Sequence, residues 1–353
     1  MKPIDRVYRA LYHEEPDMVP DPRDFGDLGG IIKKKIIKQG QDFKIWRSPF
    51  GSIHLDYVNP STGTSSGVFR HGWVDPENFV WWFTISPAVR WPEDLDRIEK
   101  PSLDYEELLK AKRKSEELHK KGYFVILSHH TAFDTAWRFL RGFKQWLTDL
   151  VRDPAFARKI IEFGIKPQIE ISKAYIEEAH VDAIYIYGDQ GTPEGPFVSP
   201  KVYREIIYPW DRRLVDTYHK KGAFCFIHSH GYIMPLMDDL IKAGFDALNP
   251  ISPLCRMNLA EVKEKYGDKI TLYADLSIEM PKNGKIDTSE YTQMLYGSDV
   301  KRKIEALSYT VKVAAPGGGF IFNRIARGLT RDQLLYMKAW EKIRRYPKMR
   351  IIK

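Results

Sequence analysis

A short apolar run ends in two histidines one residue apart in the stretch Phe224-Cys225-Phe226-Ile227-His228-Ser229-His230-Gly231. Its apolar part predicts a buried strand, and apolar residues at helical spacing from Ile233 to Ile241 predict a helix directly behind it. In α/β folds the turn between a parallel strand and its helix binds ligands, because the helix directs its N-terminal amides and positive dipole there. Two imidazoles in such a turn indicate chemistry rather than packing.

The order of strand and then helix recurs along the whole chain. Strands are predicted near 18–22, 123–127, 183–187, 223–227, 247–249, 270–273 and 320–322. Such alternation predicts a parallel sheet, and this many units in one continuous chain favours a (β/α)8 TIM barrel over an open sheet. We therefore expect residues 1–353 to form a single barrel domain.

Polar side chains follow these strands at the ends that form the mouth of a barrel. They are Arg23, Asp24, His129, His130, Asp189, His228, His230, Asn249, Asp275, Asn323 and Arg324. We expect them to converge on one site, with His228, Asp189 and His230 as the catalytic group. The other residues of the set, together with Trp81, are predicted to bind substrate.

The segment 40–95 is irregular and rich in aromatic residues, and it holds five of the nine tryptophans. It is predicted to form short strands and loops that insert over the barrel mouth, where rings such as Trp81 would wall a flat substrate. The alternative is that these rings pack a small core of their own.

The formal net charge of +8 is spread along the chain and does not indicate nucleic-acid binding. The densest basic cluster, Lys33 to Lys38, alternates with isoleucines and predicts an amphipathic helix. The sequence shows neither an apolar run long enough to span a bilayer nor an apolar signal segment near its start, so a cytoplasmic location is expected. Cys225 and Cys255 are the two cysteines, which fits a reducing compartment.

The order of motifs from Val181 to Leu276 resembles the uroporphyrinogen decarboxylase superfamily. The motifs are Gly188-Asp-Gln-Gly-Thr192, His228-Ser-His-Gly231 and the segment from Pro235 to Pro250. The opening, from Asp5-Arg6-Val7 to Val19-Pro20, resembles the same superfamily. The resemblance implies a (β/α)8 barrel and three kinds of member: decarboxylases of uroporphyrinogen, zinc methyltransferases that work with corrinoid proteins, and uncharacterised relatives.

Decarboxylases of this superfamily carry an Arg-x-x-x-Arg pair after the first strand and a Gly-His-Gly near the last strand. Here Asp27 stands four residues after Arg23, where the second Arg would be, and residues 323–328 contain no histidine. A carboxylate in place of a guanidinium would repel an anionic substrate instead of pairing with it. These departures disfavour uroporphyrinogen as the substrate.

The corrinoid methyltransferase branch resembles the chain more closely. Its zinc motif is His-x-Cys with a later Cys; here His228-x-His230 stands at the first motif and Ala326 near the second. The resemblance implies zinc on His228 and His230, with Asp189, Asp275 or His129 as a third ligand and Cys255 as a weaker alternative. The alternative is a metal-free site in which His228 and Asp189 transfer protons.

The resulting prediction is a methyltransferase that moves a methyl group between a small substrate and a separate corrinoid protein. The substrate classes are a methoxylated aromatic, a methylamine, a thiol or a reduced pterin. The alternatives are a decarboxylase acting on another acidic substrate and a non-catalytic protein that binds a tetrapyrrole or corrinoid. Whether the barrel forms a homodimer stays open.

Overall fold

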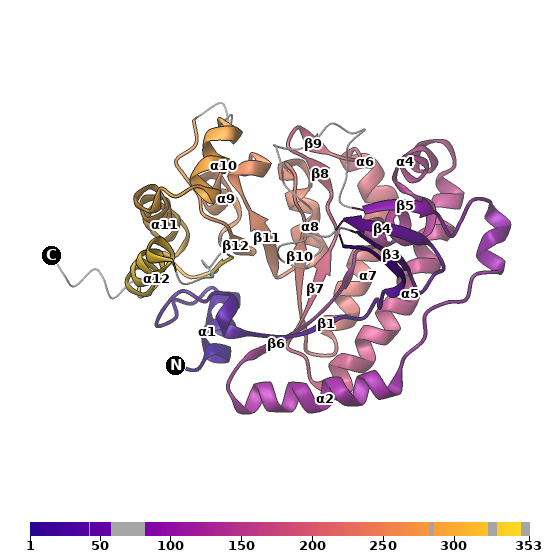
Figure 1. Ribbon diagram of the computed structural model, residues 1–353, viewed down its shortest axis with the longest axis horizontal. Helices are drawn as coiled ribbons and strands as arrows, with labels where there is room; N and C mark the ends of the chain where they lie inside the picture. Colours follow the sequence, from indigo (N-terminus) through magenta and orange to yellow (C-terminus); the bar gives the residue numbers. More distant parts are fainter. Residues whose placement is uncertain (42, 58–81, 282–285, 324–329, 347–353) are drawn as a thin grey trace.

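The computed structural model describes residues 1–41, 43–57, 82–281, 286–323 and 330–346. Its centre is a parallel sheet of seven strands in the order β1-β6-β7-β10-β11-β12-β13 (Figure 1). The strands are β1 (Phe25–Gly30), β6 (Phe124–His130), β7 (Ala183–Tyr187), β10 (Phe224–His228), β11 (Ala247–Ile251), β12 (Thr271–Ala274) and β13 (Phe320–Phe322). Each strand of this sheet pairs in parallel with the next strand in that order. This order confirms the predicted TIM-barrel class.

The two edges of the curled sheet are brought together by the segment that leads into β1. The Phe322 amide of β13 donates to the Pro20 carbonyl at 2.9 Å, and β1 itself pairs with β6. The strand predicted at 18–22 is not formed as such. Pro20 and Pro22 have no backbone N–H to give to a strand ladder, so this segment supplies an acceptor and not a regular strand.

Alternate residues of each strand face the barrel interior. Phe124, Phe226 and Tyr273 form a buried cluster there with Val7 and Leu11 of α1 (Pro3–Leu11). Because these rings and α1 occupy the interior below the strand ends, the barrel is a packed core and not a channel.

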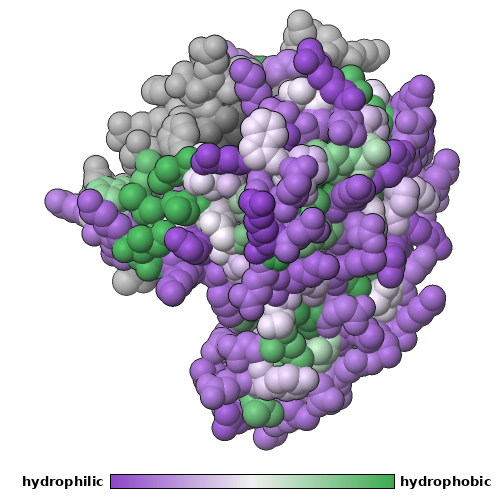
Figure 2. Space-filling view, turned by 90° about the vertical axis from the view of Figure 1, so that its right-hand side faces the viewer, coloured by the Kyte–Doolittle hydropathy of each residue, from purple (hydrophilic) through white to green (hydrophobic). Residues whose placement is uncertain are grey.

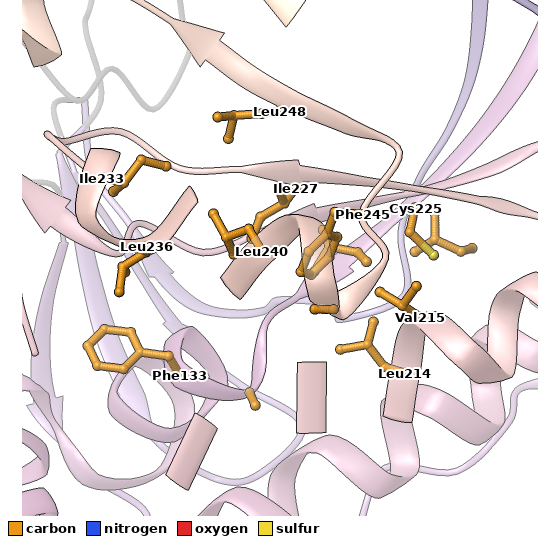
Figure 3. Packing of buried hydrophobic residues seen from close by; sticks show 14 of the residues in the cluster. Phe133, Leu214, Val215, Cys225, Ile227, Ile233, Leu236, Leu240, Phe245 and Leu248 are labelled. Carbon is orange, nitrogen blue, oxygen red and sulfur yellow. The ribbon is translucent and has the colours of Figure 1, made fainter. Parts of the chain in front are cut away.

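The opposite residues of each strand pack against the surrounding helices. The longer ones are α2 (Tyr105–Lys120), α4 (Phe143–Arg152), α5 (Pro154–Ala179), α7 (Tyr208–His219), α8 (Met237–Ala243), α9 (Leu259–Tyr266), α10 (Thr288–Tyr296), α11 (Val300–Ala314) and α12 (Arg331–Ile343). Figure 3 shows this layer around β10, where Cys225 and Ile227 lie among Leu214, Leu240 and Phe245. Cys225 is thus a buried apolar side chain, as its position in the strand predicts.

A second, antiparallel sheet of four strands lies beside the barrel. It consists of β2 (Lys35–Gln39), β3 (Phe43–Arg47), β4 (Ile53–Tyr57) and β5 (Trp82–Ser86). The helix predicted from the Lys33 to Lys38 cluster is wrong, because these residues enter β2, which is exposed along its whole length. Isoleucines favour a strand, and Ile36 and Ile37 are among its exposed residues. Figure 2 shows this side of the molecule, where hydrophobic patches stand among mainly hydrophilic residues.

The helix predicted at 134–150 is divided into three elements. These are α3 (Ala132–Thr135), the π-helix η4 (Ala136–Arg141) and α4, which begins after Gly142 at φ 82°. Arg138 lies within this π-helical turn, a feature that is frequent at functional sites. Among the described helices, none combines the length and the apolar character needed to cross a membrane.

Candidate active site

The site residues lie at the C-terminal ends of the barrel strands, where the alternation of each strand places their side chains on its inward face. In β6, Phe124 and Ile126 face the interior cluster and Val125 and Leu127 face the helices, so the same alternation turns His130 inward. The corresponding positions on the other strands are Tyr187, His228, Asn249, Asp275 and Asn323. They form one ring of side chains at the C-terminal ends of the strands.

The His228 imidazole is held by its neighbours in a defined orientation. Its Nδ1 lies 2.7 Å from Asn249 Oδ1 and 2.9 Å from the Tyr185 hydroxyl, which also donates to Asn249 Oδ1. An amide oxygen only accepts, so Nδ1 carries the proton and Nε2 keeps its lone pair. Burial lowers the pKa of His228 to about 4, so the ring is neutral near pH 7.

Asp189 lies next to this lone pair. Its Oδ1 is 4.0 Å from His228 Nε2 and accepts the His230 backbone amide at 2.8 Å. Burial by itself would raise the pKa of Asp189, but His230 and His228 hold it below its ordinary value. The two histidine rings meet edge to face, with centroids 4.9 Å apart. The three residues predicted to be catalytic therefore lie together.

The turns that carry Asp189 and His230 are fixed by close backbone contact. Gly231 has φ 103°, and a Cβ on it would come within 2.4 Å of Gly191 backbone atoms. The Tyr232 amide donates to the Thr192 carbonyl at 2.7 Å, which joins the same two turns. Glycine is needed at position 231 for both its conformation and its lack of a side chain.

Cys255 adds a sulfur atom to this group. It lies in the turn Pro253–Cys255 after β11, with Sγ 3.6 Å from His230 Nδ1. Burial raises the pKa of this thiol to about 12, so it is protonated near pH 7. Imidazole nitrogen and cysteine sulfur are the ligands that zinc prefers in proteins.

A tighter group of metal-binding residue types lies at the opposite end of β10. His219, Cys225 and Asp246 place their ligand atoms within 4.8 Å of one another, the one such group of three among the described residues. Its contacts match a second place in the barrel: Asp246 binds His219 and the Cys225 amide, and Asp182 binds His119 and the Val125 amide. The repetition indicates a structural brace between successive units and not a metal site.

Asp275 and Asn323 complete the ring of strand ends. The Asn323 side-chain amide donates to Asp275 Oδ1 at 2.8 Å, and Asp275 is buried. The charge of Asp275 favours the protonated form of His228. Both residues thus belong to the same electrostatic environment as the histidines.

A cavity of about 310 Å³ adjoins the histidine group, between the barrel mouth and the small sheet. It is lined by Gly30, Ile32, Lys34, Trp46, Ser128, His129, His130, Arg138, Phe139 and Tyr187. The Tyr187 ring separates the two regions, with its centroid 5.8 Å from that of His130 and 5.3 Å from that of His228. The volume is at the lower end of the range for small-molecule sites, about 300 to 1,000 Å³.

His130 and Arg138 share one carboxylate behind the cavity wall. Asp134, fully buried, lies 2.5 Å from His130 Nδ1 and forms an ion pair with Arg138 Nε at 3.0 Å. Burial lowers the pKa of His130 despite this carboxylate. The predicted substrate-binding residue His130 is thus placed at a cavity, next to the histidine pair.

Three residues of the predicted set make their contacts elsewhere. His129 faces the helices, donates from Nδ1 to the His130 carbonyl and accepts from the Tyr218 hydroxyl at Nε2. Arg23 pairs with Asp21 and Glu341, and Asp24 pairs with Arg6 and Arg344. His129 nevertheless lines the cavity beside His130. The contacts of Arg23 and Asp24 do not join them to His228 or to the cavity, so their predicted roles in binding receive no support from the geometry.

Two residues of the predicted set, Arg324 and Trp81, lie outside the described residues. The same holds for residues 58–81 of the aromatic-rich segment. Its described part contributes Trp46 to the cavity wall, so the insertion over the barrel mouth stays a prediction for the remainder.

Sequence reasoning missed Tyr185, Tyr187, Lys34 and Arg138. The two tyrosines had a signal, because they follow Ala183 at every second position of their strand and so share its inward face. Lys34 and Arg138 had none, since neither lies on a barrel strand: Lys34 precedes the small sheet and Arg138 lies in a π-helical turn.

Comparison with known proteins places this geometry in a family. The model of the family described as uroporphyrinogen decarboxylase (URO-D) matches residues 84–323, well over half of the chain. The chain belongs to the uroporphyrinogen decarboxylase family. The resemblance inferred from the motifs is thereby confirmed. No curated protein sequence matches this URO-D family member.

Solved structures share the fold of this URO-D family chain. A methyltransferase from Methanosarcina mazei is 13% identical, with 74% of this chain and 72% of that chain covered and a TM-score of 0.52. A 3-keto-D-glucoside 4-epimerase from E. coli is 12% identical, with 72% and 93% covered and a TM-score of 0.40. The likeness to the methyltransferase shows a common barrel fold.

Proposed function

We propose that this protein is a methyltransferase that moves a methyl group between a small substrate and a separate corrinoid protein. The observation that carries the proposal is the group His228, Asp189 and His230, in which an oriented imidazole lone pair faces a carboxylate at the barrel mouth. The fold shared with a methyltransferase supports it. Candidate substrates are a methoxylated aromatic, a methylamine, a thiol or a reduced pterin.

In this function the protein accepts or donates the proton of the heteroatom that gains or loses the methyl group. When the heteroatom gains the methyl group, His228 Nε2 accepts the proton that it releases; in the reverse direction the same atom returns it. Asp189 stabilises the positive charge on the ring, and Asn249 keeps Nε2 directed at the site. The flat corrinoid of the partner would approach the barrel mouth face on.

Zinc is a proposed cofactor, and the donor types at the site suit it. His230 and Cys255 would hold it, since their ligand atoms lie 3.6 Å apart. His228 Nε2 would be a further ligand, and in that case it would not serve as the proton acceptor. Bound there, zinc would supply Lewis acidity at the heteroatom. Asn249 already occupies the second ring nitrogen of His228, as is usual for a metal-binding histidine.

Metal content and methyl transfer test the proposal together. Elemental mass spectrometry on washed, tag-free protein is compared with the variants His228→Ala, His230→Ala and Cys255→Ser, and each is assayed for methyl transfer. Near-stoichiometric zinc that is lost in the variants supports the Lewis-acid form. Methyl transfer that survives His228→Ala would overturn the assignment of the site.

A decarboxylase acting on a different acidic substrate is the second candidate, and the description of the matched family favours it. Against uroporphyrinogen itself, Arg23 is engaged by Asp21 and Glu341, and Asp27 accepts the Gly29 amide within β1. Release of carbon dioxide without any methyl transfer would select this alternative.

A further inference from the structure

We propose that the cavity lined by Lys34, Arg138 and Trp46 binds an aromatic ring that carries an anionic group, with a carboxylate as the chemical class. The inference rests on the proposed function and narrows its substrate to a methoxylated aromatic acid. Three features of the cavity carry it: the sign of its charges, the rings in its wall and its position beside His228.

Among the described residues, the charged side chains that line the cavity are basic, and two of their acidic partners do not line it. Lys34 and Arg138 are lining residues, whereas Asp56 and Asp134 are not. Asp56 lies 2.9 Å from Lys34 Nζ, and Asp134 pairs with Arg138, and both carboxylates are buried. A ligand in the cavity therefore meets the cations first, and an anion can pair with them.

Aromatic rings form the remaining wall. Trp46, Phe139 and Tyr187 line the same space as the two cations. Trp46 is fixed because its indole N–H donates to Asp56 at 2.7 Å, and Lys34 Nζ lies 4.4 Å above its ring. Because His54 also stacks on the Trp46 indole, with centroids 4.2 Å apart, the exposed Tyr187 ring is the one against which a flat ligand can pack.

The position of Tyr187 connects this cavity to the proposed chemistry. Its ring lies between His130 in the cavity wall and His228, with centroid distances of 5.8 and 5.3 Å. A ring packed on the exposed Tyr187 side chain, with its acid group on Arg138, would lie beside His228 and Asp189. Methylammonium substrates are disfavoured, because the same two cations would repel them.

Isothermal titration calorimetry with three matched ligands tests the inference on the full-length protein. The ligands are 4-methoxybenzoate, 4-methoxybenzyl alcohol and 4-methoxybenzylamine, which differ in charge and little in shape. We expect the benzoate to bind about tenfold more tightly than the alcohol, and the amine to bind most weakly. Equal affinities, or preference for the amine, would overturn the proposal.

Variants assign the effect to the cavity. Lys34→Met and Arg138→Met should each weaken benzoate binding about tenfold and leave the alcohol unchanged. The control is Lys33→Met, since Lys33 is exposed, pairs with Glu107 and does not line this cavity. Because Arg138 is largely buried, circular dichroism checks that Arg138→Met is folded. If it fails to fold, the affinities of Lys34→Met for the three ligands decide whether the cavity binds the acid group. A charge preference that survives Lys34→Met and any folded Arg138→Met would refute the assignment.

The outcome is separable from that of the proposed function. Selective benzoate binding without methyl transfer to a corrinoid protein would support the cavity assignment and count against the methyltransferase. Methyl transfer from an amine or thiol, in a protein that binds no aromatic acid, would overturn the cavity assignment alone.

Discussion

Asn249 determines which nitrogen of His228 is available for chemistry. Replacing it by alanine removes the acceptor of the Nδ1 proton, so the ring can turn or change tautomer. We expect Asn249→Ala to lower methyl transfer by about 10 to 100-fold with little change in folding. Steady-state assays of Asn249→Ala beside Tyr185→Phe, which keeps the ring and loses the hydroxyl, check this. Full activity in Asn249→Ala would show that the orientation is set elsewhere.

His129 is a buried structural histidine whose protonation opposes folding. Burial lowers its pKa to about 3, and a protonated Nε2 could no longer accept the Tyr218 hydroxyl. The unfolded chain takes up a proton near the usual histidine pKa of about 6.5, so stability falls as pH drops below that value, by about 1.4 kcal/mol per pH unit.

We expect His129→Gln to reduce this pH dependence. Urea unfolding at several pH values between about 5 and 7 measures it as a shallower slope of unfolding free energy against pH than in the wild type. The slope and not the absolute stability is the test, because the substitution also changes packing. An unchanged slope would mean that His129 is protonated in the folded protein.

At the scale of elements, two similar braces join α2 to β6 and α7 to β10. In the second brace, Asp246 accepts the Cys225 amide at 2.7 Å and lies 2.8 Å from His219 Nε2. We expect Asp246→Ala to cost about 1.5 to 3 kcal/mol of unfolding free energy, since a carboxylate with two partners is lost. Asp216→Ala is the control, because its pair with Arg212 is exposed and should contribute less than about 1 kcal/mol. Comparable losses in urea unfolding of the two variants would contradict the brace.

The same brace predicts a pH dependence of the opposite sign to that of His129. The bond to Asp246 raises the pKa of His219. Its stabilisation is therefore complete below the unfolded value of about 6.5 and is lost as pH rises through the higher folded pKa. The stability difference between wild type and His219→Gln, followed by urea unfolding, should shrink as pH increases above neutrality. A constant difference would mean that the imidazole is neutral throughout.

At the scale of the whole molecule, one buried ionic network joins the two ends of the chain and completes the barrel. Arg344, at the end of α12, pairs with Asp21 at 2.8 Å and with Asp24 at 3.1 Å, and Trp340 donates to Asp21. This network lies beside the segment that closes the sheet against β13. It explains why Asp24, predicted at the site, serves the fold instead.

We expect Arg344→Met to lower the unfolding free energy by about 3 to 5 kcal/mol, because it leaves two buried carboxylates without their shared cation. Arg345→Met is the matched control, since the neighbouring Arg345 is exposed. Urea unfolding of both variants gives the difference. A loss below about 1 kcal/mol in Arg344→Met would show that the network does not close the barrel.

The sequence by itself determined the barrel and the centre of the site. Alternating strands and helices predict the parallel order, and His228, His230 and Asp189 lie at strand ends that a barrel must bring to one mouth. Strand alternation also indicates which of His129 and His130 faces the barrel interior. His129 shares the face of Val125 and Leu127, which pack against the helices, so His130 faces inward. These features depend on local periodicity, which the chain carries residue by residue.

Only the tertiary structure decided how distant segments meet. The cavity combines Trp46 of the small sheet, Arg138 of a π-helical turn and Tyr187 of the barrel, and their spacing in the sequence bears no relation to their distance in space. Arg23 and Asp24 form ion pairs with Glu341 and Arg344, near the other end of the chain, and do not contact the site residues. The choice among such long-range partners depends on burial and charge in the folded state, which no local pattern records.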